Sequence, residues 1–241
     1  MTIAIGTAGW SIPRQVAGKF PIEGTALERY AARFDAAEIN SSFHRPHRES
    51  TWQRWHDSVP ANLRFSVKVP KSITHDRKLV DCADLTNDFL AQSKPLGSKL
   101  AVLLVQLPPK LAFEADVAAA FFSDLGRRTK ARLVCEPRHP SWFTCEAEAL
   151  LNEHRVARVA ADPAVCDAGA VPGGWNGLSY WRLHGSPVVY RSSYLDRIDS
   201  YAGKIRRAAE AEADVWCIFD NTASSAGAGD ALALIHALQQ A

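Results

Sequence analysis

The chain has 241 residues, of which 47% are hydrophobic and 22% charged. This composition excludes intrinsic disorder and fibrous repeats, and the length suits one large domain, which we place at residues 1–241. The formal net charge of +2 is too small to produce a strong overall electrostatic attraction to nucleic acid or to an anionic membrane.

The first residues carry no targeting signal. Residues 1–11, MTIAIGTAGWS, contain no basic leader and no apolar stretch of signal-peptide length, and the longest apolar run, residues 100–105, is too short to cross a bilayer. The five cysteines are an odd number without a C-x-x-C pair, so neither a disulfide framework nor a zinc knuckle is indicated. We therefore expect a cytoplasmic protein with no membrane partner.

Eight short β-rich runs recur along the chain. They are residues 3–5, 36–39, 64–69, 100–105, 132–135, 156–160, 178–183 and 215–219. Helical patterns lie between most of them. Thr25 and Glu28 form a capping-box signal at the start of one helix, and Ser50 with Gln53 repeats that signal. Gly126 is expected to close the helix that begins near residue 113, and apolar residues at helical spacing predict a final helix.

This alternation predicts a single TIM-type (β/α)8 barrel, because each parallel crossover needs a helix-length connection. Residues 162–177 interrupt the pattern, since Pro172, Gly173 and Gly174 leave room for one short helix at most. We therefore expect a degenerate sixth helix. An open doubly wound sheet is the alternative, although no G-x-G-x-x-G motif follows the first strand to support a dinucleotide-binding fold.

Polar side chains follow all eight predicted strands. In a barrel these strand ends converge on one mouth, where the chemistry gathers. The residues that we assign to this mouth are Trp10, Glu38, Asn40, His44, Lys68, Glu136, Arg138, His139, Trp142, Asp162, Arg182, His184, Asp220 and Asn221.

The charged residues of the mouth are expected to pair, because an isolated charge beside a barrel core is costly. The bases Lys68, Arg138 and Arg182 are therefore expected to meet acids from the set Glu38, Glu136, Asp162 and Asp220. Barrels also use internal ion pairs for architecture alone, so a structural interpretation stands beside the functional one.

The sequence contains side chains that could bind a divalent metal, but their spacing matches no known metal-binding motif. His44, His75, His139 and His184 lack any H-x-x-x-H or H-E-x-x-H arrangement. We assign no metal ligand and leave the cofactor open, with a divalent metal as the alternative. Residues 220–229 place small and hydroxyl side chains before a helix, which suits either an anion site or a plain capped connection.

Two tryptophans are candidates for stacking on a substrate ring. Trp10 and Trp142 lie at predicted strand ends, beside glycine and proline. The tryptophans of residues 52–55 are instead expected to pack a helix onto the barrel.

The strand-end motifs together resemble the YecE-like family, a domain family of unknown function numbered seventy-two. The resemblance rests on residues 6–10, 38–43, 65–68, 73–75, 106–109, 136–142, 162–163, 180–185 and 219–221, and it runs from end to end. It implies a TIM-type barrel and no established reaction. The family usually has tyrosine where His44 stands, phenylalanine at Pro137 and asparagine at Asp220, so a substrate shared with its relatives is not implied.

We favour an enzyme, with a hydrolase among the reactions open to it, that acts on a small anionic substrate such as a phosphate ester or an acidic sugar. Glu136, His184, Asp162 and His139 are the candidate acid–base residues, and the other mouth residues bind the substrate. One alternative is a metal-dependent phosphodiesterase or nucleic-acid-binding barrel that uses the basic stretch of residues 44–56. Another is a non-catalytic ligand-binding protein.

Overall fold

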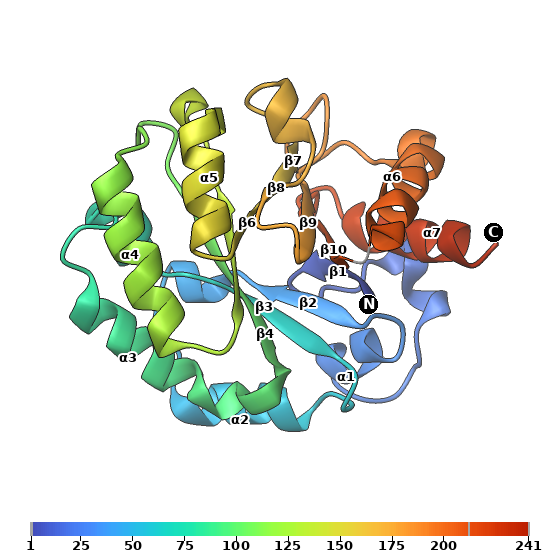
Figure 1. Cartoon of the computed structure of the whole chain (residues 1–241). Coiled ribbons are helices and arrows are strands. Elements are labelled where there is room, and N and C mark those ends of the chain that lie inside the picture. Colours follow the sequence, from blue (N-terminus) through green and yellow to red (C-terminus); the bar gives the residue numbers. More distant parts are fainter. Residues whose placement is uncertain (1, 212, 241) are drawn as a thin grey trace.

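A curled β-sheet forms the centre of the protein, and helices surround it (Figure 1). The computed structural model describes residues 2–211 and 213–240. Neighbouring strands of the sheet follow the order β7-β9-β10-β1-β2-β3-β4-β5-β6-β8. Their bounds are β1 (Ile3–Ala8), β2 (Ala36–Ile39), β3 (Arg64–Lys68), β4 (Leu100–Gln106), β5 (Arg132–Glu136), β6 (Val156–Arg158), β7 (Ala160–Asp162), β8 (Gly173–Gly174), β9 (Leu178–Leu183) and β10 (Asp214–Phe219).

All eight predicted strands are present, and the sixth is divided into two short pieces. Val159 separates β6 from β7, and β6 pairs with β5 while β7 pairs with β9, both in parallel. Because β6 and β7 follow one another in the chain, they bring the two ends of the sheet together and nearly close the barrel. The prediction of a TIM-type barrel is confirmed, and the open-sheet alternative is wrong.

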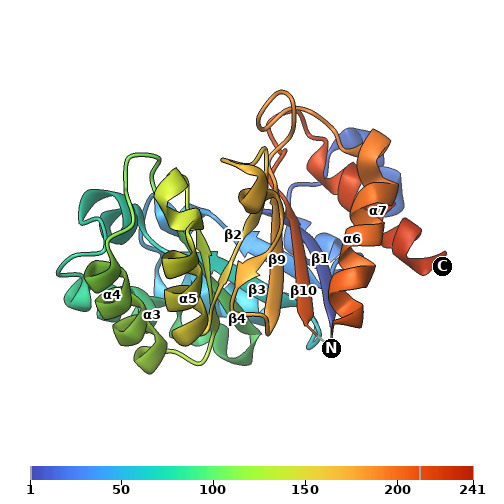
Figure 2. The same cartoon turned by 45° about the horizontal axis from the view of Figure 1, so that its top comes forward.

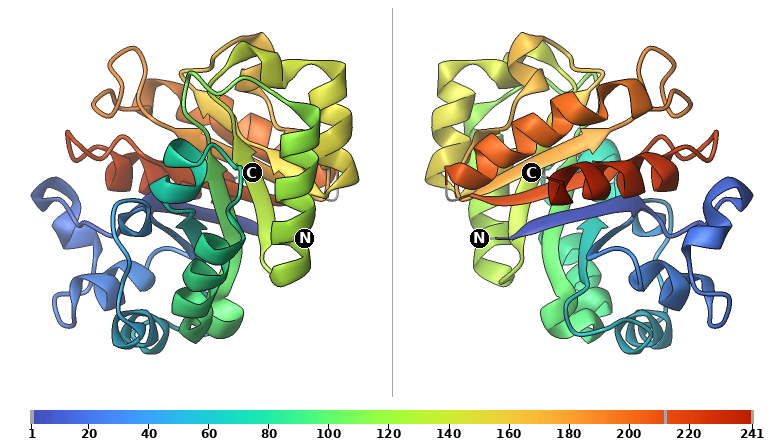
Figure 3. Two further views of the ribbon diagram at one scale, coloured as in Figure 1. Left: turned by 90° about the vertical axis from the view of Figure 1, so that its left-hand side faces the viewer. Right: turned by 90° about the vertical axis from the view of Figure 1, so that its right-hand side faces the viewer.

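Helices cover the outside of the barrel (Figure 3). Their bounds are α1 (Ala26–Ala31), α2 (Glu49–Asp57), α3 (Ala83–Ser93), α4 (Ala115–Arg128), α5 (Cys145–Glu153), α6 (Ile198–Glu210) and α7 (Gly227–Gln239). Between β7 and β9 the chain forms a short 3-10 turn, Asp167–Ala170, which is the expected degenerate sixth helix. No helix within residues 2–211 and 213–240 is both long enough and apolar enough to cross a membrane.

One predicted helix boundary is confirmed and two are wrong. Thr25 caps α1 in a complete capping box with Glu28. Ser50 does not cap α2, because that helix begins one residue earlier and Ser50 lies inside its first turn. Gly126 does not close α4. Asp124 binds Arg128 one turn later, with 2.8 Å between Oδ2 and Nε, and this pair holds the last turn helical as far as Arg128.

The strands separate two apolar layers, because successive side chains of a strand point to opposite faces. On β10, Cys217 and Phe219 pack outward against the helices, whereas Trp216 and Ile218 join the core inside the barrel. Tyr180 on β9 also points inside, where its ring stacks on Trp216 with 6.0 Å between centroids. The same alternation carries the polar side chains further along β9 toward the carboxyl end of the barrel. Figure 2 shows the loop after β9 standing above that end.

Candidate functional site

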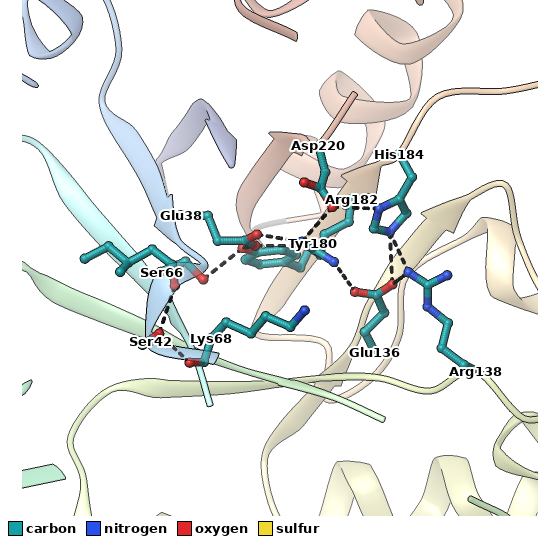
Figure 4. Close-up of polar contacts among 11 residues, drawn as sticks. Glu38, Ser42, Ser66, Lys68, Glu136, Arg138, Tyr180, Arg182, His184 and Asp220 are labelled. Atoms are coloured by element: carbon teal, nitrogen blue, oxygen red, sulfur yellow. Dashed lines mark hydrogen bonds and ion pairs between the residues drawn. The ribbon is translucent and has the colours of Figure 1, made fainter. Parts of the chain in front are cut away.

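Arg182 is the centre of a buried ion-pair network at the carboxyl end of the barrel (Figure 4). Its Nε and Nη2 bind the two oxygens of Glu38 at 3.0 and 2.6 Å. Its Nη1 lies 2.6 Å from Glu136 Oε2, and Nη2 lies 3.1 Å from Asp220 Oδ2. Burial acts to lower the pKa of Arg182, but the three carboxylates hold it well above its ordinary value.

The contacts of Arg182 change its expected role. Its side chain is 1% exposed, and three of its nitrogens are bound to carboxylates of the protein. A guanidinium held in this way has no free pair of N–H donors with which to bind a carboxylate or phosphate of a substrate. The prediction that Arg182 binds substrate is therefore replaced by a positioning role at the centre of the site.

Glu38 is likewise enclosed by the protein. It is 0% exposed, and its Oε2 accepts a hydrogen bond from the hydroxyl of Tyr180 at 3.0 Å. The same hydroxyl lies 2.9 Å from Ser66 Oγ on β3. Glu38 therefore orients Arg182 and Tyr180 rather than contacting a substrate. Sequence analysis assigned neither Tyr180 nor Ser66 to the site, although strand alternation places them on the faces of Arg182 and Lys68.

His184 lies between two carboxylates at the edge of the network. Its Nδ1 is 2.9 Å from Asp220 Oδ2, and its Nε2 is 3.0 Å from Glu136 Oε1. Arg138 Nη2 lies 3.0 Å from the same Nε2 and contacts Glu136 Oε1. A proton on Nε2 can be donated to Glu136, and an unprotonated Nε2 can accept from Arg138. Both protonation states of this nitrogen therefore find a partner.

Glu136 and Asp220 are ionised at neutral pH. Burial acts to raise the pKa of Glu136, but the charges of Arg182 and Arg138 outweigh it and hold the pKa well below its ordinary value. Burial likewise opposes ionisation of Asp220, whose pKa Arg182 and His184 lower. Two carboxylates without protons cannot act as acids, so His184 is the group between them that can carry a proton.

Arg138 and Asp220 of the network, and Lys68 beside it, are not completely buried. The side chains of Arg138 and Asp220 are 21% and 12% exposed, against 1% for His184. Lys68 is half-buried, and its Nζ lies 4.0 Å from the centre of the Phe43 ring. Burial and the nearby charge of Arg182 lower the pKa of Lys68 to about 8.

Two predicted acid–base residues lie outside this network. Asp162 binds Arg197, with 3.0 Å between Oδ2 and Nη1, and also accepts a hydrogen bond from Tyr201 on α6. It thus ties the loop before α6 and α6 itself to the barrel. His139 accepts at Nδ1 from the backbone nitrogen of Ser141 and caps a 3-10 turn. Neither side chain contacts the side chain of His184 within the described residues, although the carbonyl of Asp162 accepts a backbone hydrogen bond from His184 at 2.8 Å.

The two tryptophans pack against apolar side chains of the protein, Trp142 completely and Trp10 in part. Trp142 is 1% exposed, its Nε1 donates to the carbonyl of Leu111 at 3.0 Å, and it belongs to the apolar core. The prediction of a stacking role for Trp142 is wrong, because no face of its ring is open. Trp10 packs edge-on against Trp55 of α2, with 5.2 Å between centroids, in the layer between strands and helices.

The remaining predicted residues lie in three different places around the network. Asn221 is 0% exposed, and its Nδ2 donates to Asp230 Oδ2 at 2.6 Å, so it anchors α7 rather than a ligand. Asn40 is half-buried after β2, and its Oδ1 lacks a partner within the described chain. His44 is exposed and lines a lateral cavity of about 440 Å³. That cavity lies between α2, α3 and the turn Ser72–Asp76, beside the network rather than over it.

The histidines considered as possible metal ligands lie in different surroundings. His44 and His75 both pack on Phe43, whereas His139 caps a turn and His184 joins the ion-pair network. Within the residues that the structure describes, no three His, Cys, Asp or Glu side chains are grouped as a metal site requires.

This fold and network define a TIM-type barrel protein with a charged cluster at the carboxyl ends of its strands. The chain belongs to the family described as "Protein of unknown function DUF72", whose model matches residues 4–241. It is 30% identical over 151 residues to the UPF0759 protein YecE of Escherichia coli K12, a match that covers 62% of this chain and 54% of that relative. The chain thus spans about half the length of the curated relatives it matches.

Solved structures show the same fold. A DUF72 family protein from Enterococcus faecalis V583 matches with a TM-score of 0.83 at 20% identity, over 100% of this chain and 96% of that one. One from Thermotoga maritima MSB8 matches with a TM-score of 0.80 at 20% identity, over 100% of both chains. A methyltransferase from Methanosarcina mazei matches more distantly, with a TM-score of 0.53 at 10% identity over 98% and 94%. These likenesses confirm the barrel and identify no substrate.

Proposed function

We propose that the chain is an enzyme that acts on a small anionic substrate, a phosphorylated or acidic sugar-like compound, by acid–base chemistry at the carboxyl end of the barrel. The observation that carries the proposal is the setting of His184. Its two ring nitrogens face Asp220 and Glu136 at 2.9 and 3.0 Å, beside the accessible guanidinium of Arg138. A histidine oriented by one carboxylate and able to exchange a proton at its other nitrogen is the arrangement that general acid–base catalysis uses.

Arg138 binds the anion in this proposal. Its guanidinium is partly exposed, and its Nε has no partner in the part of the chain that the structure describes. A planar guanidinium with donors to spare suits carboxylate and phosphate groups. As Arg138 turns to the anion, Nε2 of His184 loses that donor and can exchange a proton with the substrate, while Asp220 keeps the ring oriented.

The charge balance of the site also favours an anion. Arg182, Arg138 and Lys68 face Glu38, Glu136 and Asp220, so the cluster is neutral when His184 is neutral and all three bases are charged. Protonation of His184 adds one positive charge, which a bound anion would offset. Protonation of His184 should therefore increase the affinity for an anion, and a bound anion should favour protonation of His184.

The test is a calorimetric screen of phosphorylated and carboxylated sugars, with product analysis of each compound that binds. Arg138→Gln should weaken binding about tenfold or more, whereas Arg127→Gln, which alters an exposed arginine on α4, should not. His184→Gln should retain binding and lose turnover by a factor of about 100 or more. Binding without turnover would favour the ligand-binding alternative. Salt-sensitive retention on DNA, with no small anion bound, would favour the nucleic-acid alternative.

A further inference from the structure

The amine of Lys68 has no hydrogen-bond or ion-pair partner among the described residues, unlike the amines of Lys99 and Lys71. It reaches from the end of β3 toward the network (Figure 4), and within the described residues it makes no hydrogen bond and no ion pair. The amine of Lys99, which is also buried, donates to the carbonyls of His56 and Val59. The exposed Lys71 pairs with Asp76 at 3.3 Å. Lys68 is thus partly buried, and its Nζ has no polar partner among the described residues.

Two features of the surroundings favour the neutral, nucleophilic form of this nitrogen. One is partial burial, which removes part of the water around the amine and outweighs the contact with the Phe43 ring, 4.0 Å from Nζ, that favours the charged form. The other is the positive charge of Arg182; the three carboxylates around Arg182 act in the opposite direction, but none of them forms an ion pair with Lys68 within the described residues. A lysine removed from water beside another cation favours its neutral form, which is the nucleophile. A pKa of about 8 leaves about a tenth of the amine neutral at pH 7.

We propose that Lys68 attacks a carbonyl group of the substrate and forms an imine with it. This inference rests on the proposed function and narrows its substrate to an aldehyde or ketone that also carries a carboxylate or phosphate. Arg138 holds the anionic group, and Lys68, on the opposite side of the network, meets the carbonyl carbon.

The step balances without an oxidant or a reductant. The nitrogen lone pair of Lys68 forms the C–N bond, the carbonyl oxygen takes up a proton, and the nitrogen loses one, which gives a carbinolamine. A second proton, delivered from His184 Nε2, lets the hydroxyl leave as water while the nitrogen electrons form the C=N bond of a protonated imine. The imine nitrogen then returns this proton to His184, so one amine and one carbonyl yield one imine and one water.

The imine can be trapped by reduction. Wild-type protein is incubated with pyruvate and sodium cyanoborohydride near pH 8, the pKa of Lys68, and is then analysed by intact-mass and peptide mass spectrometry. The expected result is one carboxyethyl group on the Lys68 peptide, formed about tenfold or more faster than on the Lys71 peptide. Lys68→Arg should abolish this fast label, and the control Lys71→Arg should retain it. Equal labelling of Lys68 and exposed lysines, or an unchanged fast label in Lys68→Arg, overturns the proposal.

A second carbonyl probe separates this inference from the proposed function. Acetone has a carbonyl but no anionic group, so it reports on the amine of Lys68 alone. Fast labelling of Lys68 by acetone, with no advantage for pyruvate, supports the imine and counts against the anion site. Calorimetric binding of an anion that Arg138→Gln abolishes, with Lys68 labelled no faster than Lys71 by either probe, supports the anion site and overturns the imine.

Discussion

Arg182 holds both carboxylate oxygens of Glu38, with 3.0 Å from Nε to Oε2 and 2.6 Å from Nη2 to Oε1, and the two side chains are 1% and 0% exposed. They belong to β9 and β2, on different sides of the barrel. The core near the carboxyl end is therefore ionic, whereas the core below it is apolar around Trp216. The carboxylates of the protein thus occupy Arg182, the central cation of the site, whereas Arg138 and Lys68 are partly exposed.

Replacement of Arg182 by methionine should strongly destabilise the protein. The change leaves Glu38, Glu136 and Asp220 buried without their shared counter-ion, which costs about 3–5 kcal/mol in the free energy of unfolding at neutral pH. Urea denaturation measures this cost. Arg127→Met, on the exposed face of α4, is the matched control and should change little.

The cost of Arg182→Met should shrink in acid. Glu136 and Asp220 have lowered pKa values in the folded protein, so their ion pairs stabilise it above the ordinary values of 4.5 and 3.8 and lose this effect as the pH falls through the lowered values. The wild-type and variant unfolding free energies should therefore begin to converge at about pH 4 and approach one another further as the pH falls. A difference that stays constant as the pH falls below about 4 would contradict the pairing.

Lys68 should make stability depend on pH in the alkaline range. Its pKa is about 8 in the folded chain and 10.5 ordinarily, so between these values the unfolded chain binds more protons. Stability of the wild type should therefore rise with pH relative to Lys68→Met, by about 2 kcal/mol between pH 8 and 10.5. Urea denaturation of both proteins across this range measures the difference. Parallel curves would mean that the amine is well solvated.

Trp142→Ala should reduce stability without affecting the site. Its ring is 1% exposed, and removing a buried tryptophan costs about 3–5 kcal/mol. Chemical denaturation gives the loss, and calorimetry with an anion bound by the wild type gives the affinity of the folded fraction. A variant of normal stability that binds the anion weakly would restore the stacking role.

Asp162→Asn tests whether Asp162 only holds the loop before α6 or also takes part in catalysis. The change weakens the pair with Arg197, whose side chain is 32% exposed, so the loss of stability should be about 1 kcal/mol or less. Turnover should persist, because the Asp162 side chain has no contact with the His184 side chain in the described chain, and the backbone hydrogen bond from His184 to the Asp162 carbonyl does not depend on the carboxylate. Glu136→Gln, which alters a direct partner of His184, should lose turnover. Equal losses of turnover in the two variants would return Asp162 to the site.

The elements of the barrel could be predicted from the sequence because their signals are local. The strands alternate inward and outward side chains within a few residues, and the capping box of α1 needs only Thr25 and Glu28. The same alternation, with the rule that strand ends of a barrel converge, correctly placed Glu38, Glu136, Arg182, His184 and Asp220 in one cluster.

The tertiary structure decided which partner each side chain meets. Arg182 and Glu38 are 144 residues apart in the chain, and their contact exists only because the closed sheet brings β9 and β2 to face one another across the barrel. Asp162 is a carboxylate at the end of its strand, as Glu136 is, yet Arg197 and Tyr201 bind it instead. A local pattern specifies the face of a strand, whereas the choice between neighbouring cations depends on distances that closure of the barrel sets.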